Sequence, residues 1–106
     1  MRVIAFRTIR EFYEDNPMTR RSLTTWYTIL KSQNWRKPMD AVKTFGSGNV
    51  DVLKNNRLCI DIKGNDLRII LSMNSTKNIV FIKWIGWHKN YNRLGASVHT
   101  INSKKY

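Results

Sequence analysis

Three side chains in the second half of the chain could act together on a phosphate ester, namely Arg68, His88 and Tyr91. Histidine exchanges protons near neutral pH and can serve as a general base or acid. The tyrosine hydroxyl three residues further on can hydrogen-bond a transferred proton, and its ring can stack on a base. Arginine is permanently charged and binds phosphate through paired hydrogen bonds. We therefore expect these three residues to be catalytic.

Several other chemistries lack the residues that they need. Two histidines eleven residues apart and a single cysteine do not make a zinc-binding set. No carboxylate follows Asp66, which disfavours a two-metal nuclease. The chain also has no glycine-rich phosphate loop and no hydrolase elbow. We predict an enzyme that works with a base, a phenol and cations, without a metal site or a cofactor.

This set of groups suffices to cleave RNA. RNA carries its own nucleophile, the 2′-hydroxyl, so the enzyme has three tasks. It must remove the 2′ proton, stabilise the negative charge on the phosphorane-like transition state, and protonate the 5′ leaving oxygen. A positioned acid or base typically contributes about 10²–10⁴-fold, and preorganised cations at the developing charge often contribute more.

Further cations and one aromatic side chain lie near these residues in the sequence, and a stacked aromatic ring is a common way to hold an unpaired RNA base. The residues that we expect to bind RNA are Lys63, Lys83, Trp87, Lys89 and Arg93.

Each of these residues also has a purely structural interpretation, which the sequence leaves open. Arg68 could form a cross-strand ion pair with Asp61. His88 could be a surface histidine at a strand end, Tyr91 could pack against the sheet, and Trp87 could belong to the core. The lysines could simply face solvent.

The elements that must position the candidate residues form a predicted three-stranded meander. Apolar residues alternate in the period of half-buried strands, and Gly64-Asn65 suits a two-residue hairpin turn. If Lys63 pairs with Asp66, one face becomes wholly aliphatic and Arg68 lies on the other. On the aliphatic face Leu58, Ile60 and Ile62 then meet Leu71, Ile69 and Leu67. The predicted strands are 58–63, 66–73 and 79–85.

The second hairpin decides where Lys83 lies. An even-numbered loop places Lys83 beside Arg68, whereas an odd-numbered loop places it among the aliphatic residues. Burying an unpaired lysine is costly, so we expect an even-numbered loop or a β-bulge.

The rest of the chain predicts helices that pack on the aliphatic face. A short strand at 1–5 leads into a helix from Phe6 that ends at Asn16-Pro17, since the residue before proline leaves the α region. A core stripe at Leu23, Trp26, Tyr27 and Leu30 indicates a second helix over about 19–33. A third helix begins at Pro38, and 50–53 is a brief strand. The chain is thus expected to be a single α+β domain over 1–106, with a small, mainly antiparallel twisted sheet. Helices would pack on one face, and the other face would be basic and catalytic.

Composition indicates an anionic partner. The net charge is +12 over 106 residues, and residues 67–106 contain seven Lys or Arg and no acidic residue. So large a charge on a small domain is typical of nucleic-acid binding. One cysteine fits a reducing cytoplasm. No apolar run reaches the length of a membrane span, and the first residues do not form a signal peptide. We therefore expect a cytoplasmic protein without a membrane partner.

These motifs resemble those of the HigB toxins, which belong to the RelE-like superfamily of small bacterial toxins. The resemblance rests on the Gly64–Arg68 turn and strand, the strand end Lys83–Gly86, and the His88–Tyr91 segment, and it extends to Trp35 and the segment ending at Phe45. It covers nearly the whole chain. Many relatives have threonine just before the histidine, where this chain has Trp87.

The resemblance implies a RelE-like fold and a toxin that cleaves mRNA on the translating ribosome. It also implies a cognate antitoxin that silences the toxin. Two other classes remain open from the sequence. One is a toxin of the same superfamily that poisons DNA gyrase, or a basic nucleic-acid-binding module without chemistry. The other is a basic structural protein of a ribosome or a phage.

Overall fold

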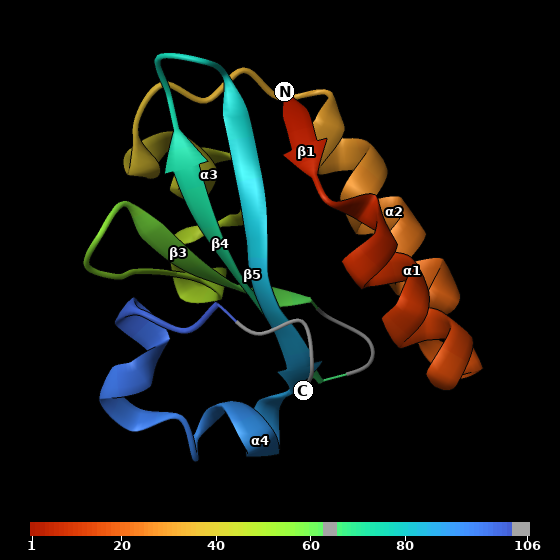
Figure 1. The fold of residues 1–106 in the computed structure, drawn as a ribbon. Coiled ribbons are helices and arrows are strands. Elements are labelled where there is room, and N and C mark those ends of the chain that lie inside the picture. Colours follow the sequence, from red (N-terminus) through yellow and green to blue (C-terminus); the bar gives the residue numbers. More distant parts are fainter. Residues whose placement is uncertain (63–65, 103–106) are drawn as a thin grey trace.

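The computed structural model describes residues 1–62 and 66–102, and shows an α+β fold around one five-stranded mixed sheet (Figure 1). The sheet order is β1-β5-β4-β3-β2; the β1–β5 pair is parallel, and the other pairs between the described strands are antiparallel. The strands are β1 (Arg2–Ile4), β2 (Val50–Val52), β3 (Arg57–Ile62), β4 (Leu67–Asn74) and β5 (Ile79–Trp87). The α-helices are α1 (Phe6–Asp15), α2 (Arg20–Lys31), α3 (Pro38–Phe45) and α4 (His88–Tyr91). Three 3₁₀ turns join them, η1 (Pro17–Thr19), η2 (Ser47–Asn49) and η3 (Gly95–His99).

The predicted register of the first hairpin is confirmed. Leu58 pairs with Leu71, Ile60 with Ile69 and Ile62 with Leu67, and all six side chains are buried. The turn predicted at Gly64-Asn65, and with it Lys63, lies outside the described residues.

The second hairpin contains both features that were expected as alternatives. Four residues separate Asn74 from Ile79, so the loop is even-numbered. The register then shifts between Ile70 and Leu71, because Trp84 pairs with Ile70 while Ile82 pairs with Leu71. Lys83 is the extra residue of this β-bulge, which keeps its ammonium group out of the aliphatic core.

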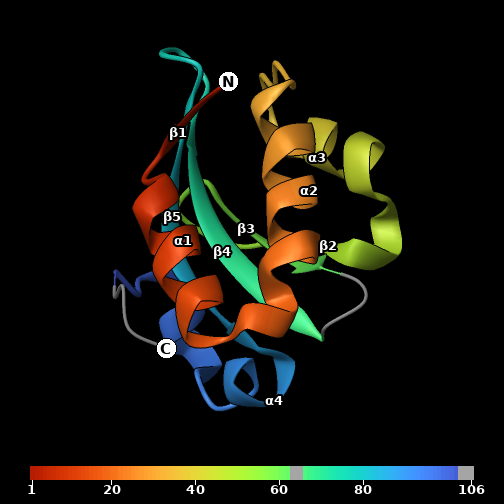
Figure 2. The same ribbon diagram turned by 90° about the vertical axis from the view of Figure 1, so that its right-hand side faces the viewer.

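The main core forms where apolar stripes of the helices meet the aliphatic face of the sheet. Ile9 and Phe12 from α1, and Leu23, Trp26 and Leu30 from α2, are buried in one cluster with the β3, β4 and β5 residues. The predicted stripe of the second helix is therefore confirmed, with Tyr27 packed at its margin. In Figure 2, α1 and α2 run side by side in front of the sheet, and α3 lies next to α2 on the side away from α1.

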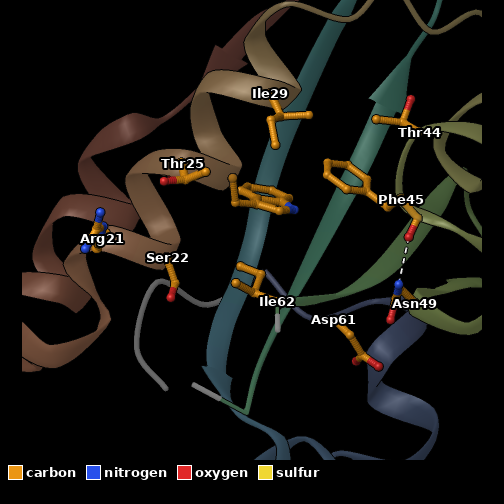
Figure 3. A pocket seen from close by; sticks show the side chains of 10 residues that line it. Arg21, Ser22, Thr25, Ile29, Thr44, Phe45, Asn49, Asp61 and Ile62 are labelled. Carbon is orange, nitrogen blue, oxygen red and sulfur yellow. Dashed lines mark hydrogen bonds between the residues drawn. The ribbon is translucent and has the colours of Figure 1, made fainter. Parts of the chain in front are cut away.

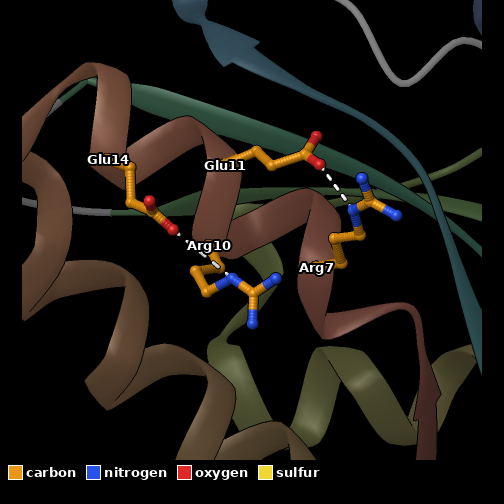
Figure 4. A network of polar contacts seen from close by, with 4 residues as sticks. All are labelled: Arg7, Arg10, Glu11 and Glu14. Atoms are coloured by element: carbon orange, nitrogen blue, oxygen red, sulfur yellow. Dashed lines mark hydrogen bonds and ion pairs between the residues drawn. The ribbon is translucent and has the colours of Figure 1, made fainter.

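The polar side of α1 carries two ion pairs at i,i+4 spacing. Arg7 Nε lies 2.7 Å from Glu11 Oε1, and Arg10 Nε lies 3.4 Å from Glu14 Oε1 (Figure 4). All four side chains are largely exposed, and each such pair stabilises a helix by only about 0.3–0.5 kcal/mol. The pairs do, however, place Glu11 and Glu14 beside cations.

The opposite face of the sheet, expected to be basic and catalytic, is partly apolar and covered. After Tyr91, where the sequence is weakly patterned, the chain turns back and covers part of this face. Ile70, Trp84 and Val98 form a second buried cluster, with Leu53, Tyr91, Leu94 and Ile101 packed against it. The physical reason is that Ile70 and Trp84 would otherwise expose a large apolar area.

Candidate functional site

Arg68 lies between two strands on the face that the C-terminal segment partly covers. It pairs with Asp61 on β3 and with Gly86 on β5. Its Nε atom is 2.6 Å from Asp61 Oδ1, and the two side chains are 17% and 31% exposed. The Nε–H does not point at an acceptor with hydrogen-bond geometry, so this contact is an ion pair without a directed bond from Nε. The ion-pair interpretation of Arg68 is therefore correct for the RNA-free chain.

Tyr91 brings its ring against the guanidinium group. The Arg68 Cζ atom lies 4.7 Å from the centre of the Tyr91 ring, within the range of a cation–π contact. The Trp84 ring also packs near Tyr91, with ring centroids 6.0 Å apart. Burial, and next the neighbouring Cys59 thiol, raise the pKa of the Tyr91 hydroxyl well above its ordinary value. Tyr91 is thus held in its protonated form, which can donate a hydrogen bond but is a poor base.

Cys59 lies on the same face of the sheet as Arg68, on β3, where it pairs with Ile70. Burial raises the pKa of its thiol from 9.0 to about 12, and a side-chain hydrogen bond with Tyr91 and the charge of Arg68 only partly oppose this shift. The side chain is 2% exposed. Because the thiolate is the reactive form, Cys59 packs in the wall of the site and does not act as a nucleophile.

His88 begins α4 directly after β5. Its backbone N–H donates a hydrogen bond of 2.8 Å to the Asp66 carbonyl, which continues the pairing of β5 with the start of β4. His88 and Tyr91 are the first and last residues of the same helical turn, and residues three apart on a helix are neighbours on its surface. The structure thus brings Arg68 and Tyr91 into contact and places half-buried His88 on the turn that carries Tyr91.

The residues expected to bind RNA lie in different surroundings. Lys89 and Arg93 are exposed on and after α4. Lys83 donates from Nζ to Asn102 Oδ1 at 3.3 Å and lies over the Phe81 ring. Trp87 packs against the main core, with its ring 5.9 Å from that of Phe12. Trp87 therefore packs against the core, one of the two interpretations that the sequence left open. Its stacking on an RNA base stays a prediction.

The β2–β3 turn ties the C-terminal segment to this face. The Lys54 backbone N–H donates to His99 Nδ1 at 3.0 Å, and Asn55 Nδ2 donates to the His99 carbonyl at 2.8 Å. The Arg57 guanidinium donates to the Ile101 carbonyl. Arg57 is only 8% exposed, and burial lowers the pKa of its guanidinium group. These contacts fix the segment that packs beside Tyr91.

Sequence reasoning missed two residues that shape the site. Gly86 is one, since a Cβ atom there would lie 2.6 Å from the Trp84 ring. The absence of a side chain at Gly86 therefore lets the Trp84 ring lie over Gly86 and near Tyr91. Arg57 is the other, because the polar residues before it indicate a turn and Arg57 was assigned to that turn. Its position two and four residues before Cys59 and Asp61 was the available signal, since alternate residues of a strand share a face.

The chain is a small, basic α+β protein in which Arg68 contacts Tyr91 and His88 lies on the same helical turn, and its family match places it in the RelE-like toxin class. The family model HigB_toxin, described as the RelE-like toxic component of a toxin-antitoxin system, matches residues 19–94. The chain belongs to this family, and the resemblance inferred from its motifs is confirmed. The match includes Arg68, His88, Tyr91 and most of the elements that position them.

No curated protein matches the chain significantly. Within residues 1–62 and 66–102, no helix is long and apolar enough to cross a membrane.

Proposed function

We propose that this toxin is a ribosome-dependent endoribonuclease that cleaves mRNA and thereby inhibits translation. Membership of a RelE-like toxin family supports a toxin role. The observation that carries the nuclease proposal is the contact of Arg68 with the Tyr91 ring at 4.7 Å, together with His88 on the same helical turn. A phosphate-binding cation, a protonated phenol and an imidazole are the groups that metal-free RNA cleavage requires.

The proposed roles follow from the chemistry of each group. Arg68 binds the scissile phosphate and stabilises the charge that develops on it. His88 and Tyr91 serve the proton transfers and hydrogen bonds of the reaction. The raised pKa of Tyr91 favours hydrogen-bond donation to an oxygen at the reacting phosphate over removal of the 2′ proton. Lys83, Lys89 and Arg93, together with Lys63, contact the RNA backbone.

The Asp61 ion pair is compatible with these roles. A phosphate oxygen and a carboxylate oxygen are both acceptors for a guanidinium group. Arg68 and Asp61 both keep some contact with solvent, so a bound phosphate can take over the position of the carboxylate without leaving a buried charge unpaired. The alternative function, a toxin that binds nucleic acid or gyrase without chemistry, is favoured if the Arg68–Asp61 pair is purely structural.

Expression in bacterial cells distinguishes these functions. Induction of the chain should arrest growth, and sequencing of transcript 5′ ends should reveal new ends inside coding regions while translation is active. If translation initiation is blocked beforehand, the new ends should be absent. Growth arrest with intact transcripts would contradict the nuclease proposal and favour the alternative function.

A further inference from the structure

A pocket of about 440 Å³ opens between α2, α3 and the end of β3, outside the Arg68–Tyr91 contact. Figure 3 shows Ile29, Phe45, Ile62 and Asp61 around it, with Arg21, Ser22 and Thr25 along α2. Trp26, Thr44 and Asn49 complete the lining. Its volume is within the range of natural ligand sites, and it is large enough for one bulky side chain of a partner.

The floor of the pocket is apolar. The Trp26 and Phe45 rings are nearly parallel, with centroids 5.9 Å apart and 20° between their planes. Ile29 on α2 is apolar although it is 41% exposed. An apolar depression with a polar margin is typical of surfaces that accept an apolar anchor from another molecule.

The Trp26 indole supplies an independent observation. Trp26 is only 5% exposed, and its Nε1 atom is buried without a hydrogen-bond partner in the described residues. Trp35, in contrast, donates from Nε1 to Thr44 Oγ1 at 2.9 Å. A buried donor without an acceptor is destabilising, and native structures contain few of them. Because Trp26 lines the pocket, an occupant that shifts the indole enough to bring Nε1 to an oxygen acceptor would remove this cost.

The charge at the margin indicates the sign of the occupant. Arg21 is exposed and forms no ion pair within 1–62 and 66–102, whereas the carboxylate of Asp61 is already paired with Arg68. The unpaired charge at the margin is therefore positive, as is the chain as a whole at +12. An acidic partner is complementary to both.

We propose that this pocket is a docking site for an acidic segment of the antitoxin, which inserts one apolar side chain between α2 and α3. An oxygen of the segment accepts the Trp26 indole N–H, and a flanking carboxylate meets Arg21. The inference rests on membership of a toxin–antitoxin family and does not require nuclease activity. Because Asp61 belongs both to the pocket and to the Arg68 ion pair, docking takes place next to the proposed catalytic arginine.

The test uses synthetic peptides and the indole N–H signals of ¹⁵N-labelled toxin. The chain has four tryptophans, and the variant Trp26→Phe identifies the Trp26 signal by its disappearance. The probe is a short peptide with one central Phe flanked by Glu residues. Its comparison peptides have Ala in place of Phe, or Lys in place of Glu. We expect saturable movement of the Trp26 signal with the Phe and Glu peptide, and affinity at least about tenfold weaker with the Ala peptide.

A matched pair of surface variants locates the binding. Ile29→Glu places a carboxylate at the pocket wall and should abolish the Trp26 response. Met39→Glu changes a similarly exposed apolar residue of α3, 54% exposed and outside the pocket, and should leave it intact. Absence of any Trp26 response, equal binding of the Ala or Lys peptides, or equal effects of the two variants would overturn the proposal.

A second copy of the chain is the competing occupant. If sedimentation equilibrium shows a wild-type dimer that Ile29→Glu dissociates, the pocket is a toxin–toxin interface and the proposal is wrong. A monomer that binds the acidic peptide supports it. None of these measurements reads RNA cleavage, so failure of the docking proposal and failure of the nuclease proposal are seen separately.

Discussion

Arg68 has two neighbours with opposite implications for its role. The carboxylate of Asp61 neutralises its charge, whereas its contact with the Tyr91 ring ties it to α4, the helical turn that also carries His88. The ion pair could be anticipated from the register, since Asp61 and Arg68 are directly opposed. The contact with Tyr91 could not, because it depends on how α4 turns back over the sheet.

Substitution of each proposed catalytic residue tests its role. Arg68→Ala removes the charge at the scissile phosphate, and His88→Gln and Tyr91→Phe remove groups that transfer or donate protons. We expect each variant to lower the rate of mRNA cleavage by about 10²-fold or more while its melting curve stays cooperative. Arg36→Ala and Tyr27→Phe are matched controls outside the candidate site and should cleave at the wild-type rate. Wild-type cleavage by all three site variants would refute the assignment.

The Cys59 thiol should make the free energy of unfolding depend on pH in the alkaline range. Its thiol pKa is raised from 9.0 to about 12 in the folded chain, so unfolding above pH 9 releases a proton. The stability that depends on this thiol is complete below pH 9 and decreases as the pH rises toward 12. Between these limits one proton contributes a slope of about 1.4 kcal/mol per pH unit to the free energy of unfolding.

The variant Cys59→Ala isolates this contribution. Urea unfolding at several pH values from 8 to 11 should give a shallower decrease in stability for Cys59→Ala than for the wild type, although the variant starts from a lower stability. Parallel curves would mean that Cys59 ionises equally well in the folded chain.

At the scale of elements, the sequence was sufficient wherever apolar periodicity was strong. The aliphatic sets 58, 60, 62 and 67, 69, 71 determine the first hairpin. The cost of burying Lys83 indicated an even-numbered loop or a bulge, and the structure has both. The C-terminal segment was not predicted, although Leu94, Val98 and Ile101 lie four and three residues apart. A 3₁₀ turn of five residues gives too short a pattern to be recognised, and the covering of the second face is a tertiary effect.

Leu71 tests the register of the meander directly. Leu71 is fully buried among residues of the main core, so Leu71→Ala leaves a cavity there. We expect the free energy of unfolding to fall by about 2–5 kcal/mol, as in other core leucine truncations. The exposed residue Met39 gives the control, since Met39→Ala should change it by less than about 0.5 kcal/mol. Urea unfolding monitored by circular dichroism measures both, and an unchanged midpoint for Leu71→Ala would contradict the packing.

For the whole molecule, the distribution of charge matters more than its total. Glu11, Glu14 and Asp61 are ion-paired, and residues 67–106 contain no acid. Within this acid-free part of the chain, Lys89 and Arg93 are exposed on α4 and just after it. Composition alone predicted an anionic partner but not the face that meets it. The fold brings α4 to the end of β5, and we propose that this face meets the partner.

Salt dependence measures the contribution of these charges. Binding to ribosomes or RNA should weaken steeply between about 50 and 200 mM salt, because counterions are released when lysine and arginine neutralise phosphates. Lys89→Gln together with Arg93→Gln should reduce the slope of log affinity against log salt by about 0.7–0.9 for each phosphate that the variant no longer neutralises. Lys37→Gln with Lys43→Gln, exposed at α3, should leave the slope unchanged. Affinity that is indifferent to salt would show that the net charge has no part in binding.

The most direct test of the proposed mechanism is cleavage of an mRNA whose sugar at the cut site lacks the 2′-hydroxyl. The mechanism uses that hydroxyl as nucleophile and assigns proton transfer and charge stabilisation to His88, Tyr91 and Arg68. We predict that ribosomes programmed with the 2′-deoxy substrate bind the toxin but release no product. The all-ribose substrate should be cut by toxin pretreated with EDTA, and its upstream fragment should end in a 2′,3′-cyclic or 3′ phosphate. Cleavage of the deoxy substrate, or inactivation of the toxin itself by chelation, would contradict the mechanism.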